Sequence, residues 1–194
     1  KEGGPEMGTT AVKLAFSHVG IHVTDVDKMV DFYTRVLGLI ETDRGEVRGL
    51  PIVFTSQDAS EHHQVVLVGG RPSELAFNPI NQLSFRVASL EDLQAVYRNA
   101  GAEPEVTKIR GTHHGYSLSV YFMDPEGNRI EVFWESEWYV RQPVAEPLDL
   151  NRPADEIRAE IEVFCRDRPG FQPLRDWQTA LAERIQSRFG AEGG

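Results

Sequence analysis

The feature that most constrains the fold of this chain is an internal repeat. A shift of 64 residues lays Ser17–Val23 over Asn81–Val87, and the match continues without a gap, since Tyr33 falls on Tyr97. Self-similarity over such a distance means that one supersecondary unit is used more than once. The chain is therefore expected to contain two copies of one unit.

Each copy begins with a strand and continues with a helix. Residues 18–23 alternate between β-branched residues and His or Gly, which is the period of a strand. Ser89 with Asp92 resembles a helix-capping pair, and Gly38 and Gly101 are expected to end the two helices in the left-handed conformation. Apolar residues recur at helical spacing between these signals, at Val26, Met29, Val30, Tyr33 and Leu37 in the first copy and at Leu90, Leu93, Val96 and Tyr97 in the second.

Three strand-like runs follow each helix, and the segment Asp124–Asn128 is a strong turn signal between the last two runs. The predicted class is α+β, with two βαβββ modules (residues 14–70 and 80–135) that form a curved eight-stranded mixed sheet, a cup whose concave face can hold a site. The six runs are Ile40–Arg44, Pro51–Thr55, Gln64–Val68, Glu105–Ile109, Leu118–Met123 and Arg129–Trp134.

The rest of the chain divides around this cup. Residues 1–12 are interpreted as a disordered N-terminal segment or a cloning remnant, residues 13–140 as one domain, and residues 141–194 as a helical extension. Two candidate helices in the extension are expected to pack on the cup or on a second subunit, so a homodimer is compatible with the sequence. Their apolar positions are Ile157, Ile161 and Phe164, then Leu174, Trp177, Leu181 and Ile185.

Composition excludes several classes of protein. Hydrophobic residues make up 40% and charged residues 26%, as in globular rather than disordered or membrane proteins. The net charge of -10 would repel a polyanion, so no nucleic-acid partner is expected, and no apolar run is long enough to span a membrane. The single cysteine, Cys165, is interpreted as a core residue of a helix, and its lack of a disulfide partner fits a cytoplasmic protein.

The repeat also identifies candidate ligands, because equivalent inward positions on the first and last strands pair His18 with Gln82 and Leu67 with Glu131. A carboxylate within an apolar strand is costly to bury unless it is paired or bound to a cation. Alone, Glu131 could be a surface residue of an edge strand, and His18 could be a hydrogen-bonded core histidine. Their joint placement favours a metal site.

The segment from His114 to Phe133 resembles the end of the catalytic half of type I extradiol catechol dioxygenases, which belong to the vicinal oxygen chelate superfamily. That family has a histidine, then a tyrosine, then a metal-binding glutamate ten residues after the tyrosine, as in His114, Tyr121 and Glu131. The strand from His18 resembles the family's first ligand strand, and the strand after His63 resembles the one led by its acid/base histidine. The resemblance covers residues 14–135.

The resemblance implies an Fe(II) site with His18 and Glu131 as ligands, a small catechol-like aromatic substrate, and dioxygen as the second substrate. It implies that His63 takes a proton from the catechol, that His114 lines the dioxygen side, and that Tyr121 bonds a substrate oxygen. Three histidines compete for these roles: His62 with His63, His113 with His114, and His22 with His18. Trp134, Trp138 and Tyr139 are interpreted as either a pocket wall or anchors for the terminal helices.

One position departs from the family, because Gln82 stands where those dioxygenases have their second histidine ligand. If Gln82 binds the metal through its amide oxygen, the affinities of the site for Fe(II), Mn(II) and other divalent ions become more similar to one another. If it does not bind, the site holds metal poorly and a non-redox role follows. The leading hypothesis is extradiol ring cleavage. The alternatives are a metal-dependent glyoxalase-like isomerase or lyase, and a non-catalytic small-molecule-binding module.

Overall fold

The two halves of the repeat fold into two similar modules in this computed structural model, which describes residues 14–72, 74 and 78–189. The segment 1–12 lies outside the described residues. The first module is β1 (Val19–His22), α1 (Val26–Arg35), β2 (Ile40–Val47), β3 (Leu50–Ser56) and β4 (Val65–Val68). The second is β5 (Leu83–Arg86), α2 (Leu90–Ala102), β6 (Thr107–His113), β7 (Ser117–Met123) and β8 (Arg129–Glu135). The α+β class and the two βαβββ modules are confirmed.

The eight strands are divided between two hydrogen-bonded sheets, in the orders β1-β4-β3-β2 and β10-β6-β7-β8-β5. The short strand β10 (Glu146–Pro147) extends the second sheet beyond β6. Within the described part of the chain no backbone ladder joins the edge strands β1 and β5. A cavity of about 670 Å³ is lined by residues of both strands, among them Val19 and Ser84. The cup is thus built from two sheets that meet across a cavity.

The helices begin as the sequence predicts. Asp25 accepts a hydrogen bond from the Lys28 backbone N–H (3.0 Å), and Ser89 does the same for Asp92 (3.0 Å). Gly38 follows α1 with a φ of 72°, the left-handed conformation that glycine adopts without strain. The prediction for Gly101 is wrong, because this residue lies inside the last turn of α2 and the cap is Glu103 in an extended conformation.

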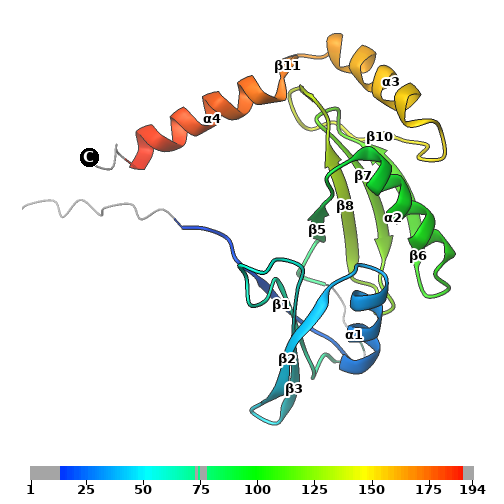
Figure 1. Ribbon diagram of the computed structural model, residues 1–194, viewed down its shortest axis with the longest axis vertical. Coiled ribbons are helices and arrows are strands. Elements are labelled where there is room, and N and C mark those ends of the chain that lie inside the picture. The colour runs from blue at the N-terminus through cyan, green and yellow to red at the C-terminus, as the bar shows by residue number, and fades with distance from the viewer. Residues whose placement is uncertain (1–13, 73, 75–77, 190–194) are drawn as a thin grey trace, which may run out of the picture.

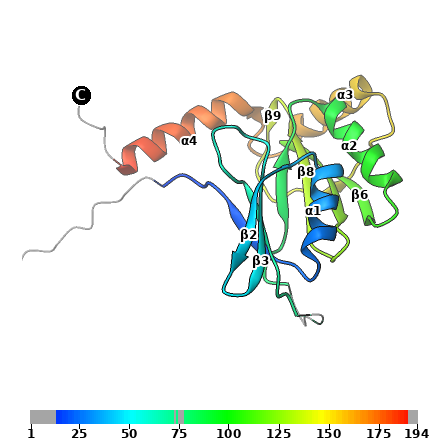
Figure 2. The ribbon, with the colours of Figure 1, turned by 60° about the horizontal axis from the view of Figure 1, so that its bottom comes forward.

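Both helices lie on one side of the sheets (Figures 1 and 2), and the core lies between them and the strands. Lys28 and Glu105 (2.6 Å) form an ion pair that links α1 to the segment after α2, as do Arg35 and Glu103. Successive residues of a strand point to opposite faces of a sheet, so in the second sheet alternate residues face α2 or the opposite side. We call the side opposite α2 the inner face. The largest fully buried side chains include Phe32, Tyr33, Met29, Leu67, Leu90, Leu118, Phe122 and Ile130.

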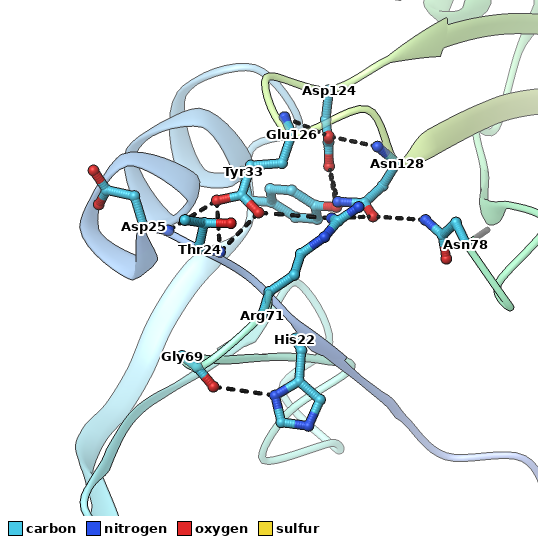
Figure 3. A network of polar contacts seen from close by, with 10 residues as sticks. All are labelled: His22, Thr24, Asp25, Tyr33, Gly69, Arg71, Asn78, Asp124, Glu126 and Asn128. Carbon is cyan, nitrogen blue, oxygen red and sulfur yellow. Dashed lines mark hydrogen bonds and ion pairs between the residues drawn. The ribbon is translucent and has the colours of Figure 1, made fainter. Parts of the chain in front are cut away.

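A polar network joins the β7–β8 turn of the second module to the first module (Figure 3). Glu126 accepts hydrogen bonds from the Thr24 and Asp25 backbone N–H groups (2.8 Å each), and the Tyr33 hydroxyl donates to Asp124 (3.1 Å). Arg71 donates to Asn128 (2.9 Å). We call Thr24, Tyr33, Arg71, Asp124, Glu126 and Asn128 the clamp. It fixes the end of β1 against the second module.

The second module is followed by β9 (Trp138–Tyr139), and then, in the segment expected as the C-terminal extension, by β10, α3 (Ala154–Arg166), β11 (Gln172–Pro173) and α4 (Leu174–Phe189). Helix α3 buries Ile157, Ile161 and Cys165, so Cys165 is the core residue that the sequence predicts, and burial raises the pKa of its thiol to about 11. Helix α4 extends away from the sheets (Figures 1 and 2). None of the helices in the part of the chain described is long and apolar enough to cross a membrane.

Candidate active site

A row of side chains crosses the inner face of the second sheet from β6 to β5. The register opposes Arg110 to Tyr121, Tyr121 to Glu131, and Glu131 to Ser84. Residues directly opposite each other on neighbouring strands place their side chains on the same face within contact distance. Strand pairing therefore gathers these four side chains, which come from four separate strands, on the inner face.

Glu131 is the buried charge of this row, with 8% of its surface exposed. Its Oε2 accepts hydrogen bonds from Gln82 Nε2 (2.6 Å) and Ser84 Oγ (2.6 Å), and its Oε1 accepts from Ser119 Oγ (2.9 Å) and Tyr121 Oη (2.5 Å). All four donors are uncharged. A buried carboxylate without a cationic partner is costly, and a divalent ion would remove that cost. The donor chemistry of the site therefore fits a metal.

Gln82 immediately precedes β5, beside Glu131. Its amide nitrogen donates to Glu131 and to Ser84 Oγ (3.0 Å), while its Oε1 has only a long contact with Asn81 Nδ2 (3.4 Å). An amide nitrogen has no lone pair available for a metal, so Oε1 is the atom that could ligate. The contact with Glu131 would hold the side chain in place while Oε1 binds.

His114 extends the network from the other side of Tyr121. Its Nδ1 lies 2.5 Å from the Val144 carbonyl oxygen and its Nε2 lies 3.0 Å from Tyr121 Oη. A carbonyl only accepts, so Nδ1 carries a proton. The single Tyr121 proton cannot serve Glu131 and a bare Nε2 at once, so both hydrogen bonds form together only when His114 or Glu131 carries an added proton. Without that proton, Tyr121 donates to one of the two groups.

Tyr121 stays a neutral phenol at ordinary pH. Burial raises the pKa of its hydroxyl well above the usual value, and the hydrogen bond to Glu131 raises it further. Tyr121 is thus a hydrogen-bond donor rather than a negative charge next to Glu131.

His18 and His63 lie together on the side of the first module, with ring centroids 4.1 Å apart. His62 bridges from His63 (Nδ1 to Nδ1, 2.9 Å) to Asp43 (2.8 Å). Partial burial lowers the pKa of His63, and the neighbouring His18 and His62 lower it further, so the His63 ring is neutral near pH 7 and can accept a proton. Both His18 and His63 come from the β1/β4 side of the cavity.

The candidate residues thus form two groups, one on each module. Gln82, Glu131, Tyr121 and His114 are linked by hydrogen bonds, and His18 contacts His63, but among the described residues no hydrogen bond or ring contact joins the two groups. The cavity is lined by Ser17 and Gln64 of the first module and by Gln82 and Ser84 of the second, and within the described residues Gln82 is the one candidate residue in its lining. Across residues 14–72, 74 and 78–189, no three His, Cys, Asp or Glu side chains lie close enough together to hold a metal ion. The predicted set contains only two residues of those types, because its third member is Gln82.

The competing histidines lie elsewhere. His113 points away from the inner face, with 5% of its surface exposed and its ring 4.7 Å from the ring of Phe164 on α3. His22 contacts the Gly69 carbonyl oxygen (3.1 Å), as Figure 3 shows. The aromatic residues at the end of the second module act as anchors, since Trp138 packs on Phe171 (5.2 Å) and Tyr139 stacks on Trp177 (4.8 Å).

Three residues of the inner face were not predicted from the sequence: Ser84, Ser119 and Arg110. Ser84 and Ser119 donate to Glu131, and the Arg110 guanidinium lies 5.1 Å from the Tyr121 ring centroid. A signal for the serines was present, because Ser84 lies two residues after Gln82 and Ser119 two residues before Tyr121. In a strand, such residues share a face.

A protein-family model described as the Glyoxalase/Bleomycin resistance protein/Dioxygenase superfamily matches residues 15–132. The chain belongs to this superfamily. Membership accounts for the paired modules.

Two curated relatives are similar in sequence to part of this chain. Biphenyl-2,3-diol 1,2-dioxygenase 2 of Rhodococcus globerulus is 29% identical over 124 residues, which are 60% of this chain and 60% of the relative. The chain thus spans about three fifths of that dioxygenase. The uncharacterized protein PA2024 of Pseudomonas aeruginosa is 27% identical over 120 residues, covering 59% of this chain and 84% of the relative.

Solved structures show the same superfamily fold. A glyoxylase/bleomycin resistance protein/dioxygenase domain from Frankia sp. EAN1pec has a TM-score of 0.53 and 23% identity, covering 64% of this chain and 99% of that one. The monoclinic form of the fosfomycin resistance protein FosX from Listeria monocytogenes has a TM-score of 0.52 and 18% identity, covering 64% and 96%. At these identities the likeness concerns the fold alone.

Proposed function

We propose that this protein is an Fe(II)-dependent extradiol dioxygenase that cleaves a catechol-like ring with dioxygen. The observation that carries the proposal is the hydrogen-bonded series His114–Tyr121–Glu131 on the inner face, beside a cavity of about 670 Å³. Cavities that hold small ligands have roughly 300–1,000 Å³. The similarity to a relative named for cleavage of a biphenyl diol supports the same reading.

His18, Gln82 and Glu131 would hold the metal, one imidazole, one amide oxygen and one carboxylate. When bound, the ion would supply a Lewis-acidic centre with open positions for both catechol oxygens and dioxygen. Ser84 and Ser119 hold the Glu131 carboxylate in orientation through their hydroxyl donors. Residues that orient a ligand in this way contribute to metal affinity although they do not touch the metal.

The remaining residues act on protons. His63, whose lowered pKa keeps it neutral, accepts a proton from the catechol as the substrate enters. Tyr121 hydrogen-bonds the substrate oxygen that lies next to Glu131. His114, whose Nδ1–H is held by the Val144 carbonyl, presents a bare Nε2 that can take up a proton and pass it toward the reacting oxygen. The β1/β4 side therefore removes a proton and the inner face returns one.

The direct test is to load the protein with Fe(II) without oxygen, add a panel of catechols, and then admit oxygen. A yellow ring-opened product is expected. Tyr121→Phe keeps the ring but removes the hydroxyl, and should lower kcat by roughly 100-fold, while the control Tyr116→Phe should leave kcat unchanged. Absence of product with every catechol, despite one iron per chain, would contradict the proposal.

Gln82 favours a second candidate, a metal-dependent isomerase or lyase in which the ion polarises a carbonyl or an epoxide. A neutral oxygen ligand weakens the preference for iron over harder ions such as Mn(II). The Listeria relative of the same fold has been crystallised with Mn(II). Turnover of glyoxalase substrates or of fosfomycin with Mn(II), Co(II) or Ni(II), in the absence of oxygen, would favour this candidate. Oxygen dependence would favour the dioxygenase.

A further inference from the structure

Arg110 stands at the end of the row that contains Tyr121 and Glu131. Its Cα is opposite that of Tyr121 in the β6–β7 ladder, and its guanidinium carbon lies 5.1 Å from the Tyr121 ring centroid. The side chain is exposed. Arg110 therefore presents a positive charge on the inner face, beside the series of hydrogen bonds that leads to Glu131.

This charge has no ion-pair partner among the residues that the structure describes, whereas the other arginines of the inner face are engaged. Arg86 contacts Glu135 (3.3 Å) and Arg129 donates to Asn81 (3.2 Å). On the segment that follows β10, the Asp149 carboxylate is bonded to Asn151 (2.9 and 3.0 Å). Tyr121 is a neutral phenol and provides no negative charge. The guanidinium is left with its donors available.

The backbone of β6 is irregular just before Arg110. The register shifts between Thr107 and Arg110, and Lys108 has a φ of 54°, which side chains other than glycine rarely adopt. A bulge changes the direction in which the next side chains point, and such bulges are common beside functional sites. This one sets Arg110 on the same face as Tyr121. Strain of this kind persists only where the surrounding structure maintains it.

We propose that Arg110 binds a carboxylate of the substrate, so that the preferred substrates are catechols with a carboxylate on the ring. The inference rests on the proposed function for the diol end of the substrate. Tyr121 lies between Arg110 and Glu131 in the row, so a substrate whose diol lies at Glu131 would extend over the Tyr121 ring, and its far end would meet the guanidinium at the edge of that ring. Because the whole chain carries a net charge of -10, an anionic substrate needs such a local cation.

The test compares dihydroxybenzoates with the matching dihydroxybenzamides, which have the same shape without the charge. Equilibrium dialysis gives dissociation constants for protein with and without metal, and oxygen uptake gives kcat/KM. Arg110→Gln should weaken binding of the carboxylates by roughly tenfold and leave the amides within about twofold. Arg110→Lys should restore part of the preference. The control Arg175→Gln, on α4, makes the same change in net charge and should have no effect.

The outcomes separate this inference from the proposed function. Benzoate, which lacks the diol, should bind more tightly than benzamide in an Arg110-dependent manner even if no catechol is cleaved. If catechols are cleaved but Arg110→Gln affects carboxylates and amides equally, Arg110 only packs on Tyr121 and the inference is overturned while the dioxygenase assignment stands. Failure of every carboxylate to bind overturns it as well. Circular dichroism of the variants checks that they fold.

Discussion

Glu131 lies in the middle of β8, where its neighbours Ile130 and Val132 face the core and its own carboxylate faces the inner side of the sheet. Four uncharged groups donate to this carboxylate, so its hydrogen-bonding capacity is filled while its charge is uncompensated. A cation bound there would interact with a carboxylate that is already shielded from water. Without metal, the buried charge lowers the stability of the protein.

The substitution Glu131→Gln should therefore separate stability from metal binding. The amide keeps the shape and removes the charge, and the hydroxyls of Ser119 and Tyr121 can rotate to accept from it, with Tyr121 then donating to His114. We expect the free energy of unfolding without metal to stay within about 1 kcal/mol of the original value. Metal binding should be lost. Urea titration and equilibrium dialysis measure the two quantities, and loss of both together would mean that Glu131 is mainly a structural residue.

At the residue scale, the sequence could identify candidate site residues but not the side chains that surround them. The internal repeat selects Glu131, and the resemblance to the dioxygenases selects Tyr121 by its spacing from Glu131. The ladder between β7 and β8 explains that spacing, because it opposes the two residues directly. His113 and His114 are adjacent in sequence and differ only in the face that they present. Arg110 could not be selected, because its direction depends on a bulge that has no clear sequence signal.

Helix α3 covers a second buried ionisable group. His113 lies beneath it on β6, packed against Phe164, and its Nδ1 has no hydrogen-bond partner in the described structure. Burial lowers the pKa of His113 from 6.5, and Arg168 lowers it further, against the opposing effect of Glu146 and Glu160. Between the lowered pKa of the folded protein and pH 6.5, His113 therefore binds a proton in the unfolded chain but not in the folded protein.

Because the pKa of His113 is lower in the folded protein, this residue lowers the free energy of unfolding as the pH falls. Its contribution is fully favourable above pH 6.5 and is lost progressively as the pH falls toward the lowered folded pKa. His113→Leu should flatten this part of the pH dependence and, because it removes an unsatisfied buried nitrogen, raise stability at neutral pH by about 1 kcal/mol. Urea unfolding between pH 5 and pH 8 checks both points. Parallel curves for the two proteins would count against the assignment.

A glycine in β6 allows the extension to dock. A Cβ on Gly111 would lie 2.3 Å from the Leu148 carbonyl oxygen, which belongs to the segment that follows β10. Gly111→Ala should force that segment away and destabilise the protein by about 1–3 kcal/mol, as expected for overpacking. Gly45→Ala is a matched control, because a Cβ on this strand glycine meets nothing within 4 Å. Thermal unfolding compares the two variants. Equal midpoints would show that the Leu148 segment moves aside without loss of stability.

At the element scale, the sequence predicted strongly periodic segments best. Helix α2 begins at the expected cap, α1 begins at the first residue of the expected apolar series, and β7 begins one residue before and β8 ends one residue after the expected run. The prediction for β6 is shifted, from residues 105–109 to Thr107–His113, because the bulge at Lys108 interrupts the alternation. The two-residue strands β9, β10 and β11 carry too few residues for any period, and only tertiary contacts create them.

On the scale of the whole molecule, the candidate ligands come from different modules: His18 precedes β1, while Gln82 and Glu131 belong to the second module. Internal repetition predicts that the modules resemble each other, but not how they are held. The holding contacts are polar and far apart in sequence, such as the pairs Thr24–Glu126 and Arg71–Asn128 of the clamp. No periodic pattern encodes such a pairing.

The clamp should therefore control the metal site from a distance. Glu126→Ala leaves the backbone N–H groups of Thr24 and Asp25 without their acceptor, and should lower the free energy of unfolding by about 2 kcal/mol. Because the end of β1 is then less firmly held, His18 should be less well positioned and metal affinity should fall severalfold. Glu46→Ala, at an exposed position of β2, makes the same change of charge as a control.

Two further measurements make this prediction specific. A ligand that needs only the inner face, such as benzoate at Arg110, should bind the Glu126→Ala protein as well as the original, since the row on the second sheet is intact. Metal affinity should fall in the same variant, because the metal requires both modules. If affinity for metal were unchanged while stability fell, His18 would not be a ligand, and the metal would depend on Gln82 and Glu131 of the second module alone.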